Sequence, residues 1–365
     1  MLVIIAVAVL GSAAASIRRF RPVQPGSGVA PHSLCTTEKV DDPVREPSRH
    51  RETLYSAPAQ SRYEYTEYHM GVDVRIVAYA NEKALAERAC AAAFERFAEL
   101  DTIMSDYRDT SELMRLCAHA GGPAVTVSRD LIIVLQRSQE LARRTGGAFD
   151  VSCGPLVRLW RKARKAGVLP PQSEIDNARS RVGWTFVELN ARKRSIRLLK
   201  PGMQLDLGAI GKGYADDCAQ QVLKRFGVTC ALVEAGGDIV VSGAPPGEAG
   251  WKIQVPNAGN DKEPPMRFAN AAISTSGDLE QSTVIEGRRY SHIVDPRTGR
   301  PLTDRIQITV VACDGLTSDG LSTAISVVGP EKGRALARSY PGATIYVRYA
   351  DGDPHAGQPG RFFRP

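Results

Sequence analysis

The chain has 365 residues, of which 43% are hydrophobic and 24% are charged, as in ordinary globular proteins. Its seven cysteines are too few for a disulfide-dense scaffold, and it has no run of about 20 apolar residues, which excludes a polytopic membrane protein. The 47 Lys and Arg exceed the 40 Asp and Glu and give a net charge of +7, so nucleic acid or an anionic ligand is an expected partner.

The first segment is an apolar run over residues 2–15 that ends in three alanines and is followed by two arginines. It is short for a membrane-spanning helix, and the alanines offer a small-residue cleavage pattern. We interpret residues 1–16 as a signal peptide or an N-terminal anchor, which predicts a periplasmic protein, either exported or held on the outer face of the cytoplasmic membrane. No Lys or Arg precedes the run, so a mis-assigned start and a cytoplasmic protein stay open. Residues 17–62 are rich in Pro, Ser, Arg and Glu, which predicts a flexible tether.

Residues 63–350 alternate between strand and helix patterns and are expected to form one domain, followed by a C-terminal tail over 351–365. A strand–helix–strand repeat with a GxGxxG turn is missing, which argues against a Rossmann domain. The pattern predicts an α+β fold, a single large domain of mixed, mainly antiparallel sheet with packed helices. The expected strands are 72–79, 186–189, 195–199, 231–233, 239–241, 251–255 and 308–312; the expected helices are 83–104, 128–144, 213–226 and one from about 318.

The densest basic run lies at residues 158–165, which hold five Lys and Arg. Aromatic residues do not alternate with these cations as they do in proteins that bind single strands. Zinc-finger spacing and RNA-binding signatures are also missing from the sequence. We therefore interpret the run as a solvated helix face and expect no nucleic-acid partner.

Two glycine-rich stretches hold more polar residues than a core needs. In residues 145–150, Asp150 could accept a hydrogen bond from a ligand, although a helix stop and turn capped by Asp150 is favoured when the stretch is taken alone. In residues 206–215 a strand ends, glycines follow, and a helix begins at about Gly213. The free N–H groups of a helix start and the cation of Lys212 favour a diphosphate, although a purely structural turn stays open.

Two further stretches carry a candidate base and a candidate metal pair. His292 lies in the dense polar motif of residues 290–301, where it is suited to proton abstraction, or to a structural role in a rigid loop. Asp319 and Thr323 are four residues apart at the start of the last expected helix, so their oxygens share one face and suit Mg²⁺. Simple helix capping by Ser318 or Asp319 is the alternative. Together, the four stretches indicate chemistry on a diphosphate.

The order of these motifs resembles that of the ApbE-type FAD:protein FMN transferases, from about residue 70 to residue 343. The string from His292 to Pro301, HIVDPRTGRP, is highly specific. The landmarks are Met70-Gly71, Asp101–Arg108, Gly147–Asp150, Asp206–Tyr214, Gly236–Asp238, Ser274–Gly277, Ser291–Pro301 and Asp319 with Thr323. The resemblance implies a fold related to the T-fold and Mg²⁺-dependent transfer of FMN from FAD to a Thr hydroxyl of a target flavoprotein, with release of AMP.

The resemblance also implies roles for individual residues. Those similar to the FAD contacts of the family are Met70, Tyr107, Ala148, Phe149, Asp150, Asp206, Lys212 and Ile273, with the flavin ring near Tyr107 and Phe149. Those similar to its metal ligands are Ala209, through the carbonyl, Asp319 and Thr323. The expected catalytic residues are His292, which would activate the acceptor Thr, Asp319 and Lys212. Hydrolysis of FAD to FMN and AMP, or flavin binding without catalysis, are the alternatives.

Overall fold

The computed structural model describes four stretches of the chain, residues 60–255, 264–277, 282–303 and 305–349. The expected signal or anchor, the C-terminal tail and nearly all of the tether lie outside the described residues. The first strand begins at Ser61, so the last two residues of the expected tether belong to the folded part. Among the described helices, none combines the length and the apolar character that crossing a bilayer requires.

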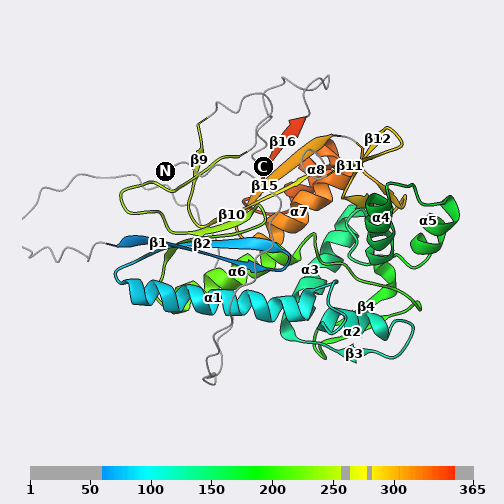
Figure 1. The fold of residues 1–365 in the computed structure, drawn as a ribbon, viewed down its shortest axis with the longest axis horizontal. Coiled ribbons are helices and arrows are strands. Elements are labelled where there is room, and N and C mark those ends of the chain that lie inside the picture. The colour runs from blue at the N-terminus through cyan, green and yellow to red at the C-terminus, as the bar shows by residue number, and fades with distance from the viewer. Residues whose placement is uncertain (1–59, 256–263, 278–281, 304, 350–365) are drawn as a thin grey trace, which may run out of the picture. The chain divides into compact units, whose positions relative to one another are not determined.

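Most helices of the described residues lie in the first half of the folded part, and ten strands, β6 to β15, follow one another between α6 and α7 (Figure 1). The helices are α1 (Lys83–Met104), α2 (Glu112–Ala118), α3 (Arg129–Thr145), α4 (Gly154–Ala166), α5 (Gln172–Arg179), α6 (Gly211–Arg225), α7 (Gly315–Val328) and α8 (Pro330–Ala337). The strands are β1 (Ser61–His69), β2 (Val72–Ala80), β3 (Val125–Thr126), β4 (Val187–Asn190), β5 (Ser195–Leu198), β6 (Cys230–Ala235), β7 (Asp238–Ser242), β8 (Trp251–Ile253), β9 (Met266–Phe268), β10 (Ala271–Gly277), β11 (Ser282–Ile285), β12 (Arg288–Ser291), β13 (Val294–Asp295), β14 (Arg300–Pro301), β15 (Ile306–Ala312) and β16 (Thr344–Tyr349).

The central element is a seven-stranded sheet in the order β1-β2-β6-β7-β10-β15-β16, in which every neighbouring pair is antiparallel. Successive side chains of a strand point to opposite faces of a sheet. Val74 and Ile76 of β2 therefore join the main core with α1, α6 and α7, whereas Val77 packs on the other face with β8. The α+β fold with a mainly antiparallel sheet is confirmed.

Both ends of helix α3 follow from capping signals in the local sequence. Ser128 caps it by accepting a hydrogen bond from the Leu131 N–H, and Gly146 ends it in the left-handed conformation. The hairpin of β4 and β5 also forms as expected. The expected strand over 251–255 is shorter, because β8 ends at Ile253.

Several elements differ from the sequence expectation. Strand β1 was not expected, because it is an edge strand with mostly exposed side chains and so lacks an apolar alternation. Helix α6 begins at Gly211, two residues early, and α7 begins at Gly315. The cap of α7 is Asp314, whose side chain accepts from the Thr317 N–H, so the capping alternative for Ser318 or Asp319 is wrong.

Candidate active site

Helices α6 and α7 meet backbone to backbone close to their first turns. A Cβ atom added at Gly213 would overlap the Gly315 carbonyl oxygen, and one added at Gly315 would overlap the Gly213 carbonyl oxygen. Only glycine fits at such a close approach. The contact brings the start of α6, which carries Lys212, against the second turn of α7, which carries Asp319.

Two buried carboxylates, Asp238 and Asp319, and the half-buried Lys212 form a cluster of charges at this contact. The Lys212 Nζ lies 2.8 Å from Asp238 Oδ2 and 4.0 Å from Asp319 Oδ2, and the two carboxylates are only 4% and 3% exposed. Asp319 Oδ2 also accepts a hydrogen bond of 3.1 Å from the Gly213 N–H. The sequence-predicted pair of Lys212 and Asp319 is thus brought together, in the company of a second acid.

The pKa values of this cluster reflect burial and mutual attraction. Burial, followed by the nearby Asp238 charge, raises the pKa of Asp319 to about 7, although Lys212 acts in the opposite direction. Burial on its own would lower the pKa of Lys212, but Asp238 and Asp319 outweigh it and raise the pKa above its ordinary value. Lys212 therefore remains a cation at neutral pH, and two acids compete for it.

The expected metal ligands supply oxygen donors around Asp319. Thr323 lies one turn further along α7, and its Oγ1 is 2.8 Å from Ser276 Oγ of β10. Ala209 lies in the turn before α6, directly after Gly208, whose carbonyl accepts from Lys212 Nζ at 3.4 Å. Three His, Cys, Asp or Glu side chains do not gather into a metal-binding group anywhere in the described residues. One carboxylate, one hydroxyl and one carbonyl are hard-oxygen donors that fit Mg²⁺, and a cation would also compensate the buried Asp319.

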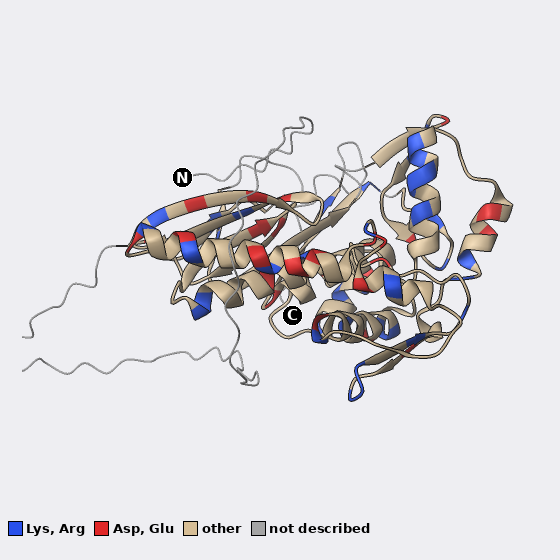
Figure 2. Cartoon of the chain, turned by 60° about the horizontal axis from the view of Figure 1, so that its bottom comes forward, with Lys and Arg blue, Asp and Glu red and all other residues tan. Residues whose placement is uncertain are grey.

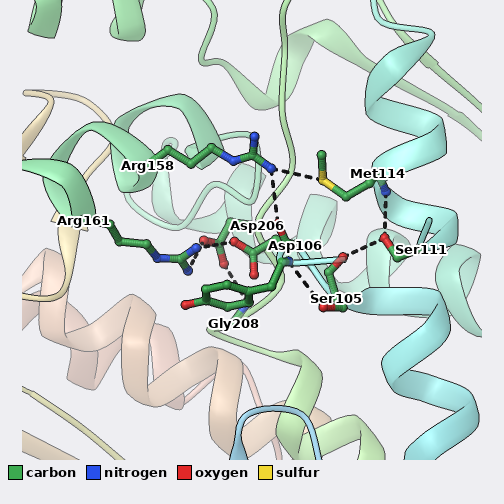
Figure 3. A network of polar contacts seen from close by, with 9 residues as sticks. Ser105, Asp106, Ser111, Met114, Arg158, Arg161, Asp206 and Gly208 are labelled. Carbon is green, nitrogen blue, oxygen red and sulfur yellow. Dashed lines mark hydrogen bonds and ion pairs between the residues drawn. The ribbon is translucent and has the colours of Figure 1, made fainter. Parts of the chain in front are cut away.

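Tyr107, Arg161 and Asp206 form a second group, and Figure 3 shows Arg161 pointing toward Asp106 and Asp206. The Arg161 guanidinium lies over the Tyr107 ring, 4.5 Å from its centroid, while Tyr107 is 76% exposed. Arg161 Nη2 also pairs with Asp206 Oδ2 at 3.0 Å, and Asp206 Oδ1 accepts from the Gly208 N–H at 2.8 Å. Asp206 therefore links the loop that carries Tyr107 to the turn before α6.

The basic run of α4, visible as a row of basic bands on that helix in Figure 2, is not simply a solvated face. Arg158, Arg161 and Arg164 are half-buried and donate to partners on other elements, whereas Lys162 and Lys165 are exposed. Spacing of three residues keeps the arginines near one side of the helix, which faces the loop between α1 and α2. The expectation of a solvated face is therefore wrong for the three arginines and holds for the two lysines.

The glycine-rich stretch before α4 is packed in the interior, where Ala148, Phe149 and Asp150 are all buried. Asp150 Oδ1 accepts from the Ser152 N–H and hydroxyl, and Oδ2 accepts from the Trp184 N–H at 2.8 Å. Burial raises the pKa of Asp150, although these hydrogen bonds favour the carboxylate. The side chain thus closes a turn but caps no helix, since Gly146 ends α3 and α4 begins after Cys153 without a side-chain cap. A ligand contact of Asp150 stays a prediction.

The other expected site residues lie at three places around the sheet. Met70, in the turn between β1 and β2, packs toward Gly211 at the start of α6. Ile273 is buried on β10, next to Ser274, whose hydroxyl is 2.8 Å from the Ser318 hydroxyl of α7. His292 is half-buried between β12 and β13, directly after Ser291, whose carbonyl accepts from the Arg164 guanidinium at 3.4 Å.

Sequence reasoning did not assign Asp238 or Arg161 to the site. A signal for Asp238 was present, because a carboxylate that follows two glycines and opens an otherwise apolar strand needs a buried partner. Arg161 carried a weaker signal, the three-residue spacing of arginines on α4. Its partners, Asp106 and Asp206, lie 45 or more residues away in sequence, so only the fold brings them together.

Comparisons with known proteins agree with this architecture. The profile of the ApbE family matches residues 70–347. An FAD:protein FMN transferase of Vibrio cholerae is 33% identical over 247 residues, covering 66% of this chain and 73% of that protein. One from Treponema pallidum is 31% identical over 307 residues, covering 79% and 85%.

Solved structures give the same result. The flavin transferase ApbE from Vibrio cholerae superposes with a TM-score of 0.71 at 28% identity, covering 83% of this chain and 97% of that one. The apo form of the flavinyl transferase ApbE from Pseudomonas stutzeri gives a TM-score of 0.72 at 27% identity, covering 84% and 95%. The family match spans most of the chain, and the long coverage and shared fold agree with it. The chain therefore belongs to the ApbE family.

Proposed function

We propose that this protein transfers FMN from FAD to the hydroxyl of a Thr in a target flavoprotein, in a reaction that depends on Mg²⁺, forms a phosphoester and releases AMP. The observation that carries the proposal is the meeting of Lys212 with the buried Asp238 and Asp319 where α6 and α7 begin. A half-buried cation and hard oxygen donors beside a helix start suit a diphosphate with its counterion. The relatives named FAD:protein FMN transferase support the same assignment.

The proposed metal ligands are the Asp319 carboxylate, the Thr323 hydroxyl and the Ala209 carbonyl. Mg²⁺ held there supplies neutralisation of the negative charge on the diphosphate. Lys212 adds a fixed positive charge beside it, and its pairing with Asp238 holds the ammonium group in place.

In the proposed reaction, the acceptor Thr hydroxyl oxygen attacks the phosphorus of the FMN half of FAD. A P–O bond to the acceptor forms, the phosphoanhydride P–O bond breaks, and AMP leaves with the bonding electron pair. His292 takes the hydroxyl proton, which makes a weak nucleophile competent near neutral pH. If water takes the place of the acceptor, the same atoms give FMN and AMP.

The proposed FAD contacts are those implied by the family resemblance: Met70, Tyr107, Ala148, Phe149, Asp150, Asp206, Lys212 and Ile273. Tyr107 offers an exposed aromatic ring suited to stacking on the flavin. The buried Ala148 and Phe149 would act through backbone and shape rather than through exposed side chains.

We also propose a periplasmic location, with residues 1–16 as a signal peptide or as an anchor that tethers the enzyme to the membrane.

The direct test incubates the protein with FAD, Mg²⁺ and a target domain that carries the acceptor Thr, followed by in-gel flavin fluorescence of the target. We expect a fluorescent target band that depends on Mg²⁺. Steady release of AMP and FMN with an unlabelled target would identify a hydrolase instead. Tight FAD binding with neither product would identify a flavin-binding protein.

His292 is tested by replacement with Ala. We expect His292→Ala to bind FAD as tightly as the wild type but to transfer FMN more slowly by about 100-fold or more, the range typical of a lost general base. An unchanged transfer rate would remove His292 from the mechanism as the base.

A further inference from the structure

Arg161 of α4 connects two parts of the site that are far apart in sequence. Its Nη1 pairs with the Asp106 carboxylate, and its Nη2 pairs with Asp206 Oδ2 at 3.0 Å. The same guanidinium covers the Tyr107 ring. One side chain thus holds the loop between α1 and α2 against the turn that leads into α6.

The loop that carries Tyr107 has further anchors. Arg158 Nη2 donates to the Asp106 carbonyl oxygen at 3.2 Å, and the Ser111 hydroxyl donates to the Ser105 carbonyl oxygen at 2.7 Å. The Tyr107 N–H in turn donates to Ser105 Oγ at 3.3 Å. The backbone around Tyr107 therefore has anchors besides Arg161, whereas the ring itself is covered by Arg161.

The Tyr107 ring has two faces in different surroundings. Arg161 lies over one face, whereas the side chain as a whole is 76% exposed, so the ring presents a large free surface. An exposed aromatic side chain ordinarily samples several rotamers, and ordering one on binding costs free energy. A cation over one face favours a single ring orientation before any ligand arrives.

We propose that Arg161, braced by its ion pairs with Asp106 and Asp206, is a positioning residue that holds Tyr107 as a preformed platform for the flavin ring of FAD. The inference rests on the proposed function, because it takes FAD as the substrate and Tyr107 as a flavin contact. Arg161 acts on FAD binding through Tyr107 and does not take part in the breaking of the phosphoanhydride. Its loss therefore raises the KM for FAD and leaves kcat within about twofold of the wild type.

The experiment measures FAD affinity by quenching of flavin fluorescence, with a chelator present so that no turnover occurs. The variants are Arg161→Gln, Tyr107→Ala and the double variant, with Lys162→Gln as the matched control from the exposed side of α4. We expect Arg161→Gln to weaken FAD binding about tenfold and to reduce the quenching at saturation. Arg161→Lys keeps a cation but cannot bridge both carboxylates as the guanidinium does. Its FAD affinity should therefore lie between those of the wild type and Arg161→Gln.

The double variant separates positioning from a general structural effect. If Arg161 acts through Tyr107, Arg161→Gln has less than a twofold effect on FAD affinity once Tyr107 is Ala. The same tenfold loss in both backgrounds, or unchanged affinity and quenching in Arg161→Gln, would overturn the inference. Wild-type protein that does not quench flavin fluorescence at all would instead defeat the proposed function.

A variant that loses the fold is recognised by its thermal unfolding midpoint. In that case Asp106→Asn, which removes one anchor of Arg161 and keeps the side-chain shape, takes the place of Arg161→Gln. It should weaken FAD binding in the same direction, and unchanged affinity in a folded Asp106→Asn protein would also overturn the inference.

Discussion

Asp319 and Asp238 both face the ammonium group of Lys212; the two carboxylates are buried, and the Lys212 side chain is half-buried. Removing charges from water costs free energy that a single ion pair does not fully return. Two acids and one Lys leave an excess negative charge, which a divalent cation would balance. At the scale of residues, the cluster is more consistent with a ligand site than with a stabilising salt bridge.

Asp319→Asn keeps the side-chain volume and an oxygen that can accept from the Gly213 N–H. It removes the proposed carboxylate ligand, so Mg²⁺ affinity should fall by about 100-fold or more, measured by calorimetric titration. Ser326→Ala on the same helix is the matched control, because its hydroxyl only bonds back to the Ser322 carbonyl. Equal Mg²⁺ affinity in Asp319→Asn and the control would contradict the metal assignment.

Asp216 of α6 is fully buried, and neither of its carboxyl oxygens has a hydrogen-bond partner among the described residues. Burial, followed by the nearby Asp238 and Asp217 charges, raises its pKa well above the ordinary value of about 3.9. A raised pKa contributes stability below about pH 4 that is lost as pH rises through the folded-state pKa.

Asn cannot titrate, so Asp216→Asn removes this pH dependence. The free energy of unfolding of Asp216→Asn relative to the wild type should therefore increase as pH rises above about 4, by at most about 1.4 kcal/mol per pH unit. Urea unfolding without added metal, at several pH values, measures the difference. If the difference in the free energy of unfolding between Asp216→Asn and the wild type stays constant above about pH 4, the Asp216 carboxyl has an ordinary pKa in the folded protein.

At the scale of elements, the site depends on how closely α6 approaches α7. Ala is the better residue in a plain helix by about 1 kcal/mol, yet Gly213 has no room for a Cβ because the Gly315 carbonyl is in the way. The approach of these two backbones, rather than local propensity, places Lys212 beside Asp319.

Gly213→Ala should lower the free energy of unfolding by about 1–3 kcal/mol, because α6 and α7 must move apart to admit the methyl group. Gly211→Ala is the matched control two residues earlier, where the nearest atoms to an added Cβ lie at 3.8 Å. The control should be neutral or slightly stabilising. Equal unfolding midpoints for the two variants would contradict the close approach of the helices.

Elements with their own local signals could be predicted from the sequence. Helix α3 has a Ser cap and a Gly stop, and α1 has an apolar stripe, so both were expected with correct bounds to within a residue or two. Strand β1 could not be found in this way, since an edge strand with exposed side chains has no apolar pattern. The start of α7 was misplaced because Asp314, Gly315 and Thr317 look like a turn until the backbone of α6 packs against them.

The candidate site was predictable only in part, for a related reason. Lys212 and Asp319 stood out as polar residues in glycine-rich or helical contexts. Their partner Asp238 comes from a different strand of the sheet, and Arg161 meets Asp206 across a long separation in sequence. Such contacts depend on tertiary packing, which composition and periodicity do not encode.

At the scale of the whole molecule, some of the positive charges can be assigned to particular contacts. Several of the cations have partners on other elements: Lys212 pairs with buried acids, and Arg161 pairs with Asp206 and covers the Tyr107 ring. Arg158 donates to the loop between α1 and α2, and Arg164 donates to Ser291 of β12. A basic composition is consistent with the proposed substrate, which is an anionic dinucleotide.

The measurement that tests the central proposal most directly follows both products of one reaction. Protein, FAD, Mg²⁺ and an acceptor domain are incubated together; intact-mass spectrometry follows the acceptor, and chromatography follows AMP. We predict a mass gain equal to one FMN less one water, one AMP per modified acceptor, and no gain when the acceptor Thr is replaced by Ala. AMP release accompanied by free FMN and an unmodified acceptor, or no product at all, would contradict it.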